Sequence, residues 1–117
     1  MADIENYRCT VAITLEVIGG KWKSLILWHL NFNTLRFSQL QRRLAKVTQK
    51  MLTQQLRELE AAGLVHREVY AEVPPRVEYS LTELGRSVVP ILELMCQWGS
   101  DYLEATEGEA PAKCHGV

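Results

Sequence analysis

The strongest constraint on the fold is a pair of short helix patterns separated by only a few residues. The first covers about residues 39–45, and the second starts at Gln49 and ends before Gly63. In both, leucines recur every three or four residues, which places them on one side of a helix. They are Leu40 and Leu44 in the first helix and Leu52, Leu56 and Leu59 in the second. Two such helices joined by a short turn predict a helix-turn-helix unit.

The residues around these patterns are typical of helix ends. Ser38 and Thr48 precede the two helices, where a side-chain oxygen can accept a hydrogen bond from a free backbone N–H. Gly63 follows the second helix, where a left-handed residue commonly ends a helix. We therefore expect Ser38 and Thr48 as N-caps and Gly63 as the C-terminal stop.

Two strand patterns follow, over 64–70 and 77–81. The six residues between them include Pro74 and Pro75, which favour a stiff protruding loop over a tight turn. A short extended segment at 35–37 precedes the helix-turn-helix. A helix-turn-helix followed by a two-stranded ribbon predicts a mainly α winged helix-turn-helix with a small β-wing.

The rest of the chain is predicted to be helical. Helices are expected over 10–18, with Thr10 as its N-cap, and over 21–31, which is apolar on most sides and reads as a central helix. A last helical region follows Thr82, and Pro90 should break it near 88–89. Its apolar stripe either closes the domain's own core or joins two subunits; it comprises Leu84, Val88, Ile91, Leu92, Met95, Trp98 and Tyr102.

A chain of 117 residues fits one domain. We assign residues 1–103 to a winged helix-turn-helix domain that also carries the dimerisation surface. Residues 104–117 are small and polar, and we expect them to form a flexible tail.

The side of the second helix opposite its leucines carries groups that suit DNA bases. Glutamine can form two hydrogen bonds with adenine, arginine and lysine can bind guanine, and the threonine methyl can contact thymine. The plainer interpretation is a solvated helix surface. The predicted base-reading residues are Gln49, Lys50, Thr53, Gln54 and Arg57, with Glu58 and Glu60 expected to lie away from the DNA.

Positive charge is concentrated around this motif although the net charge is −1. Between Arg36 and Arg67 there are seven basic residues against two glutamates. Such a segment can present a positive surface to phosphates, which positions a protein without reading sequence. The predicted phosphate and wing contacts are Ser38, Arg42, Arg43, Lys46, Arg67 and Arg76.

The two most specific of several matching stretches are Ile18-Gly19-Gly20-Lys21-Trp22 and Pro74-Pro75-Arg76-Val77-Glu78-Tyr79-Ser80-Leu81-Thr82. With them the chain resembles the HxlR family of bacterial winged-helix regulators over about residues 9–103. The resemblance implies a homodimer, joined through the first and last helices, that binds a pseudo-palindromic operator in duplex DNA. It also implies that some members sense oxidants or electrophiles through a cysteine near the N-terminus, the position of Cys9.

Cys9 is the candidate sensor thiol. It precedes a predicted helix N-terminus, whose dipole favours a thiolate, and Arg8 is adjacent. The alternative is an inert, partly buried side chain. Cys96 is expected to be structural. Cys114 and His115 in the tail are too few for a zinc site. We expect neither a metal nor a cofactor.

Two other classes of function compete with a DNA-binding regulator. One is a winged-helix protein-interaction module without DNA binding, which the basic surface argues against. The other is a cysteine-dependent enzyme, but no base is positioned for Cys9, and His29 and His66 belong to no recognisable catalytic arrangement. No apolar run approaches the ~20 residues of a membrane helix, and the N-terminus is acidic rather than apolar. We therefore expect a non-enzymatic cytoplasmic protein.

Overall fold

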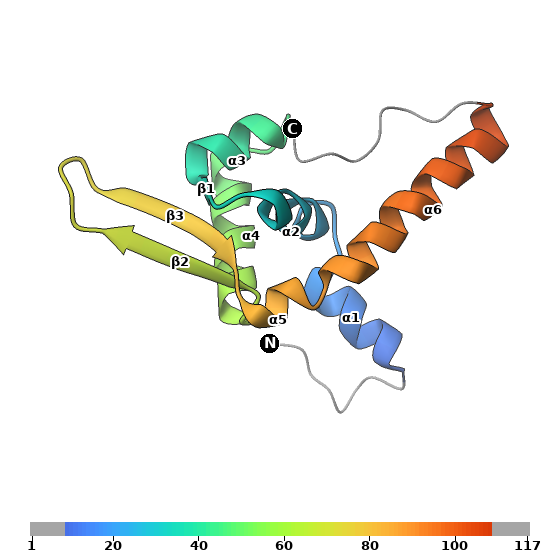
Figure 1. The fold of residues 1–117 in the computed structure, drawn as a ribbon, viewed down its shortest axis with the longest axis horizontal. Coiled ribbons are helices and arrows are strands. Elements are labelled where there is room, and N and C mark those ends of the chain that lie inside the picture. Colours follow the sequence, from blue (N-terminus) through green and yellow to red (C-terminus); the bar gives the residue numbers. More distant parts are fainter. Residues whose placement is uncertain (1–8, 109–117) are drawn as a thin grey trace.

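The computed structural model describes residues 9–108 and has the predicted winged helix-turn-helix architecture, with helices packed around a small sheet (Figure 1). The helix-turn-helix is formed by α3 and α4, and the wing by β2 and β3. The elements are α1 (Thr10–Ile18), α2 (Lys23–Phe32), β1 (Leu35–Arg36), α3 (Phe37–Arg43), α4 (Gln49–Ala61), β2 (Val65–Tyr70), β3 (Arg76–Leu81), α5 (Glu83–Arg86) and α6 (Val89–Glu107).

Both ends of α4 follow the local signals in the sequence. The Thr48 Oγ1 accepts a hydrogen bond of 3.0 Å from the backbone N–H of Met51, which makes Thr48 the predicted N-cap. Gly63 has a φ of 84°, the left-handed conformation in which a Cβ would be strained. These two residues therefore limit α4 to the length that the sequence predicted.

The expected caps of α3 and α1 are wrong. α3 begins at Phe37, so Ser38 lies inside its first turn, and the Arg36 N–H donates 2.8 Å to the side-chain oxygen of Gln39. The cause is non-local, because β1 pairs with β3 and holds Arg36 extended, so the helix starts directly after the strand. α1 likewise has Cys9, not Thr10, at its N-cap, and the Cys9 side chain makes no capping hydrogen bond.

The sheet has three antiparallel strands in the order β1-β3-β2. Leu35 of β1 and Arg67 of β2 are both partners of Tyr79 in the central strand. The buried side chains Leu35, Val65, Tyr79 and Leu81 give the sheet one apolar face. The short extended segment before α3 is thus an edge strand that closes the core.

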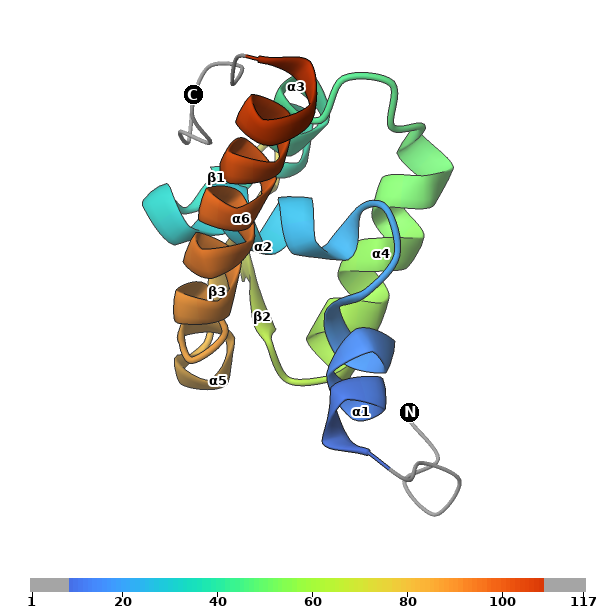
Figure 2. The same cartoon turned by 90° about the vertical axis from the view of Figure 1, so that its right-hand side faces the viewer.

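The core lies around α2, which contacts α3, α4, α6 and the central strand. Figure 2 shows α2 behind α6 and beside α4. The prediction of a central helix is therefore confirmed. The side chains with almost no exposed surface come from α2, α3 and α4: Ile26, Leu27, Leu40, Leu52, Leu56 and Leu59.

The last helical region is broken where Pro90 predicts. α5 ends at Arg86, and Pro90 lies in the first turn of α6, where its missing N–H costs no hydrogen bond. Thr82 caps α5 by accepting 3.0 Å from the Gly85 N–H. Gly85 itself packs so closely that a Cβ would lie 2.1 Å from the Leu64 carbonyl oxygen. α6 continues to Glu107, past the domain boundary expected at 103, and residues 109–117 of the expected tail lie outside the described residues.

Most of the apolar stripe on α5 and α6 does not close the core. Leu92 is buried, whereas Trp98 is 66% exposed and stacks on Tyr102 at 5.2 Å between ring centroids. On α1, Leu15 is similarly exposed at 63%. Figure 1 shows α6 projecting from the body on the side opposite the wing. The stripe thus remains exposed to solvent. None of the helices in the described part of the chain is both long and apolar enough to span a bilayer.

Candidate nucleic-acid interface

The buried leucines of α4 determine which of its residues face outward. Leu52, Leu56 and Leu59 are at most 2% exposed. In an α-helix, most residues that alternate with such a stripe project from the opposite side. That side carries Lys50, Gln54 and Arg57, which are exposed, with half-buried Thr53 at its edge, whereas Gln49 continues the leucine spacing and is exposed as the first residue of the helix.

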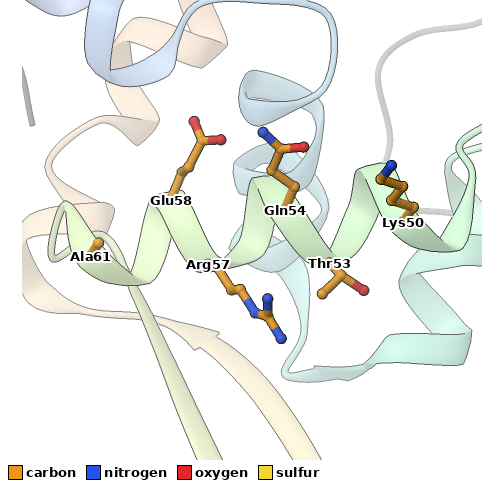
Figure 3. Close-up of a pocket in the computed structure, with 6 residues that line it drawn as sticks. All are labelled: Lys50, Thr53, Gln54, Arg57, Glu58 and Ala61. Carbon is orange, nitrogen blue, oxygen red and sulfur yellow. The ribbon is translucent and has the colours of Figure 1, made fainter.

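Figure 3 shows that this outward side is divided into two rows. Lys50, Gln54 and Glu58 point to one edge of the helix, and Thr53 and Arg57 point to the other. Members of each row are four residues apart, the spacing that stacks side chains along a helix. The Thr53 hydroxyl also donates 2.8 Å to the Gln49 carbonyl oxygen. Both rows line one open pocket along the outward side of α4, as the sequence-based interpretation of a single surface predicts, and Thr53 and Arg57 in addition line a second groove.

Glu58 lies in the row of Lys50 and Gln54 rather than behind it. Its Oε1 is 2.8 Å from Nζ of Lys23, a mostly buried lysine of α2. The hydrogen bond from Lys23 lowers the pKa of Glu58, and the smaller effect of burial opposes it. The pair neutralises the carboxylate at the end of this row and ties α4 to the central helix. Sequence reasoning missed Lys23, although a lysine in a helix as apolar as α2 is itself a signal.

The row of Thr53 and Arg57 faces a groove of about 340 Å³ between α4 and the sheet. Arg57 from α4 and Arg67 from β2 line it together, and Glu60 is a carboxylate on its wall. The full lining is Phe37, Thr53, Leu56, Arg57, Glu60, Arg67 and Tyr79. The fold therefore brings together two arginines that the sequence assigned to separate roles.

The predicted phosphate contacts of α3 and the following turn differ in exposure. Ser38, Arg42 and Lys46 are exposed, and Lys46 adopts a left-handed φ of 77° in the turn. Arg43 is half-buried near His29 of α2. Burial, and to a smaller extent the charge of Arg43, lower the pKa of His29, which keeps this imidazole neutral near pH 7.

Arg76 makes its contacts with other residues of the wing. Its guanidinium carbon lies 4.0 Å from the centre of the Tyr70 ring. Its Nε is 3.4 Å from Glu72, and its Nη1 is 3.7 Å from Glu78. Arg67 is exposed and, among residues 9–108, makes no ion pair. The two wing arginines therefore differ: Arg76 is partly neutralised, and Arg67 offers its full charge.

Cys9 is exposed at the N-cap of α1, whereas Cys96 is half-buried on α6. Arg8 and Cys114 lie outside the described residues. In the part of the chain that is described, no group of three or more His, Cys, Asp or Glu side chains could hold a metal ion.

The family model of the HxlR-like helix-turn-helix matches residues 17–107. The chain belongs to this family. A helix-turn-helix transcriptional regulator of Methanothermobacter thermautotrophicus is 58% identical to it over 98 residues, which cover 84% of this chain and 75% of the relative. The expectation drawn from the two sequence stretches is therefore confirmed, and the chain is a member of a family of transcriptional regulators.

Solved structures of similar proteins agree with the fold. The reduced form of the redox regulator HypR superposes with a TM-score of 0.81 at 51% identity, covering 86% of this chain and 99% of that chain. The reduced form of the transcriptional regulator YodB from B. subtilis gives a TM-score of 0.73 at 30% identity, covering 85% and 98%. The winged-helix architecture is thus shared by structures of close and more distant relatives.

Proposed function

We propose that this HxlR-like protein is a sequence-specific regulator of transcription that binds duplex DNA as a homodimer. The observation that carries the proposal is the exposed polar and basic side of α4, which is held outward by the buried leucines on its other side. In a helix-turn-helix, the second helix enters the major groove with its N-terminal end. Gln49, Lys50 and Gln54 begin that helix and carry donors and acceptors suited to base edges.

The backbone contacts come from the elements on either side of α4. Exposed Ser38, Arg42 and Lys46 precede it, and Arg67 follows it in the wing. Arg43 and Arg76 are more enclosed, so they would contribute less unless their side chains move on binding. Phosphate contacts of this kind orient the recognition helix without reading bases.

The homodimer is proposed from α1 and α6. Both leave large apolar side chains exposed, among them Leu15, Leu94 and Trp98. Exposed apolar side chains gathered on a surface favour protein association over solvent contact. In a two-fold dimer the recognition helices would be spaced about 34 Å apart, one turn of DNA, which is why we expect a pseudo-palindromic operator. We place such a regulator in the cytoplasm, where a prokaryotic cell keeps its chromosome.

The salt dependence of binding to a duplex tests the proposal. Counterion release predicts that log K falls linearly with log salt, with a slope of about −0.9 for each phosphate contacted. In vitro selection from a random duplex library should enrich an inverted repeat. Binding that does not depend on salt, or an unenriched library, would favour a winged-helix module that binds proteins instead.

A finer proposal concerns Cys9. Its exposed position at the N-cap of α1 would allow an oxidant or electrophile to reach the thiol, and the relative HypR is described as a redox regulator. Operator binding should be compared before and after diamide treatment in wild type, Cys9→Ser and the control Cys96→Ser. Loss of the response in Cys9→Ser alone supports the proposal. An equal response in wild type and Cys9→Ser rules it out.

A further inference from the structure

The groove between α4 and the wing contains two arginines without partner carboxylates among the described residues. Arg57 points to this edge of α4 in Figure 3, away from Lys50 and Gln54. Neither Arg57 nor Arg67 takes part in an ion pair within residues 9–108. Each guanidinium therefore keeps its donors available to a group that enters the groove.

Strand register explains why Arg67 faces the groove. Arg67 is the cross-strand partner of Tyr79, and directly opposed residues in a sheet project from the same face. Tyr79 is buried on the apolar face that covers the core. Tyr79 and Arg67 both line the groove. Glu68 and Glu78 are also cross-strand partners, one position along each strand, and so project from the opposite face. Arg67 therefore projects from one face of the wing, and Glu68 and Glu78 project from the other.

The groove is suited to a small anion with several acceptor oxygens. Two arginines line the groove, and Glu60 is the one acidic residue in its lining. Both arginines are exposed, so a ligand attached to a larger molecule could reach them. Arginine binds phosphate with two parallel hydrogen bonds, which a pair of arginines from different elements can direct onto one group.

We infer that this groove binds one backbone phosphate of the bound duplex, and that Arg57 and Arg67 donate the hydrogen bonds to it. The inference rests on the proposed DNA binding and refines it. The two rows of α4 then have different tasks: Lys50 and Gln54 face the bases, and Arg57 fixes the register of the helix on the DNA. Arg57 is in this view a positioning residue, although its place in the sequence suggested a base contact.

The test measures binding to two duplexes, one enriched by selection and one of random sequence, over a range of salt concentrations. Arg57→Ala and Arg67→Ala should each weaken binding to both duplexes by the same factor, about tenfold at 0.1 M salt, and reduce the salt slope by about one. Glu60→Gln removes the carboxylate from the groove and should strengthen binding to both. The control Gln54→Ala should weaken binding to the selected duplex alone.

Several outcomes would overturn the inference. A loss confined to the selected duplex would make Arg57 a base-reading residue, and an unchanged salt slope in both arginine variants would exclude a phosphate from the groove. If Arg57→Ala does not fold, as judged by circular dichroism, Arg57→Gln and Arg67→Ala provide the same measurement. Wild-type protein that binds neither duplex would overturn both this inference and the proposed function, whereas normal wild-type binding with unaffected variants would overturn only the inference.

Discussion

α4 and α6 are both amphipathic, but they expose opposite kinds of surface. Each buries leucines on one side: Leu52, Leu56 and Leu59 on α4, and Leu92 on α6. Beyond that shared feature, α4 presents amides and cations, whereas α6 presents Trp98, Tyr102 and other apolar groups. A polar, positive surface favours a polyanion, and an apolar surface favours another protein. Under the proposed function, the fold would bind DNA at one helix and a second subunit at the other.

The largest expected effect comes from the buried side of α4. Leu56→Ala should lower the free energy of unfolding by about 2–5 kcal/mol, because it leaves a cavity beneath the helix. Urea denaturation followed by circular dichroism measures this change. The control Lys50→Ala, on the exposed side, should stay within about 0.5 kcal/mol of wild type. Equal effects of the two substitutions would contradict the assignment of the two sides.

An exposed apolar residue of α6 can be replaced by a charged one without disturbing the core of the subunit. Trp98→Asp should weaken self-association by at least about 2 kcal/mol, since a large aromatic side chain at an interface commonly contributes that much. Sedimentation equilibrium measures the association constant, with Glu104→Gln on the same helix as the control. A Trp98→Asp protein that stays as dimeric as wild type would place the subunit interface elsewhere.

The exposed surface of α4 is tested by base preference. Gln54→Ala should cost about 1–3 kcal/mol on the selected duplex and almost nothing on a random one, because it removes hydrogen bonds to one base. Fluorescence anisotropy with both duplexes separates the two values. A loss of the same size on both would mean that Gln54 contacts the DNA backbone.

The smallest expected effect concerns the Lys23–Glu58 pair that ties α4 to α2. Folding lowers the pKa of Glu58. The contribution of the ion pair to the free energy of unfolding is therefore complete above the unfolded pKa and is lost as the pH falls through the folded pKa. The Glu58 side chain is 43% exposed, so solvent weakens the pair and Glu58→Gln should cost less than about 1 kcal/mol at pH 7. The difference in free energy of unfolding between Glu58→Gln and wild type should shrink as the pH is lowered below the ordinary glutamate pKa of 4.5. A difference that does not change with pH would exclude the ion pair as its cause.

Sequence reasoning succeeded where the signal is local. The leucine spacing of α4, the Thr48 cap, Gly63 and the break at Pro90 all depend on residues within a few positions of one another. It failed at Ser38, because the start of α3 depends on β1 pairing with a strand some forty residues later. It also missed the engagement of Arg76 by Glu72 and Glu78, which depends on how the wing folds back.

The sequence alone determined the order of the elements, the buried side of α4 and membership of the HxlR-like family, since periodicity, capping and motif identity are properties of neighbouring residues. Tertiary structure alone decided the starting point of α3, the division of the α4 surface into two rows and the meeting of Arg57 with Arg67. It also decided that the α6 stripe stays exposed. Each of these depends on contacts between segments far apart in the chain, and a linear pattern contains no distance between them.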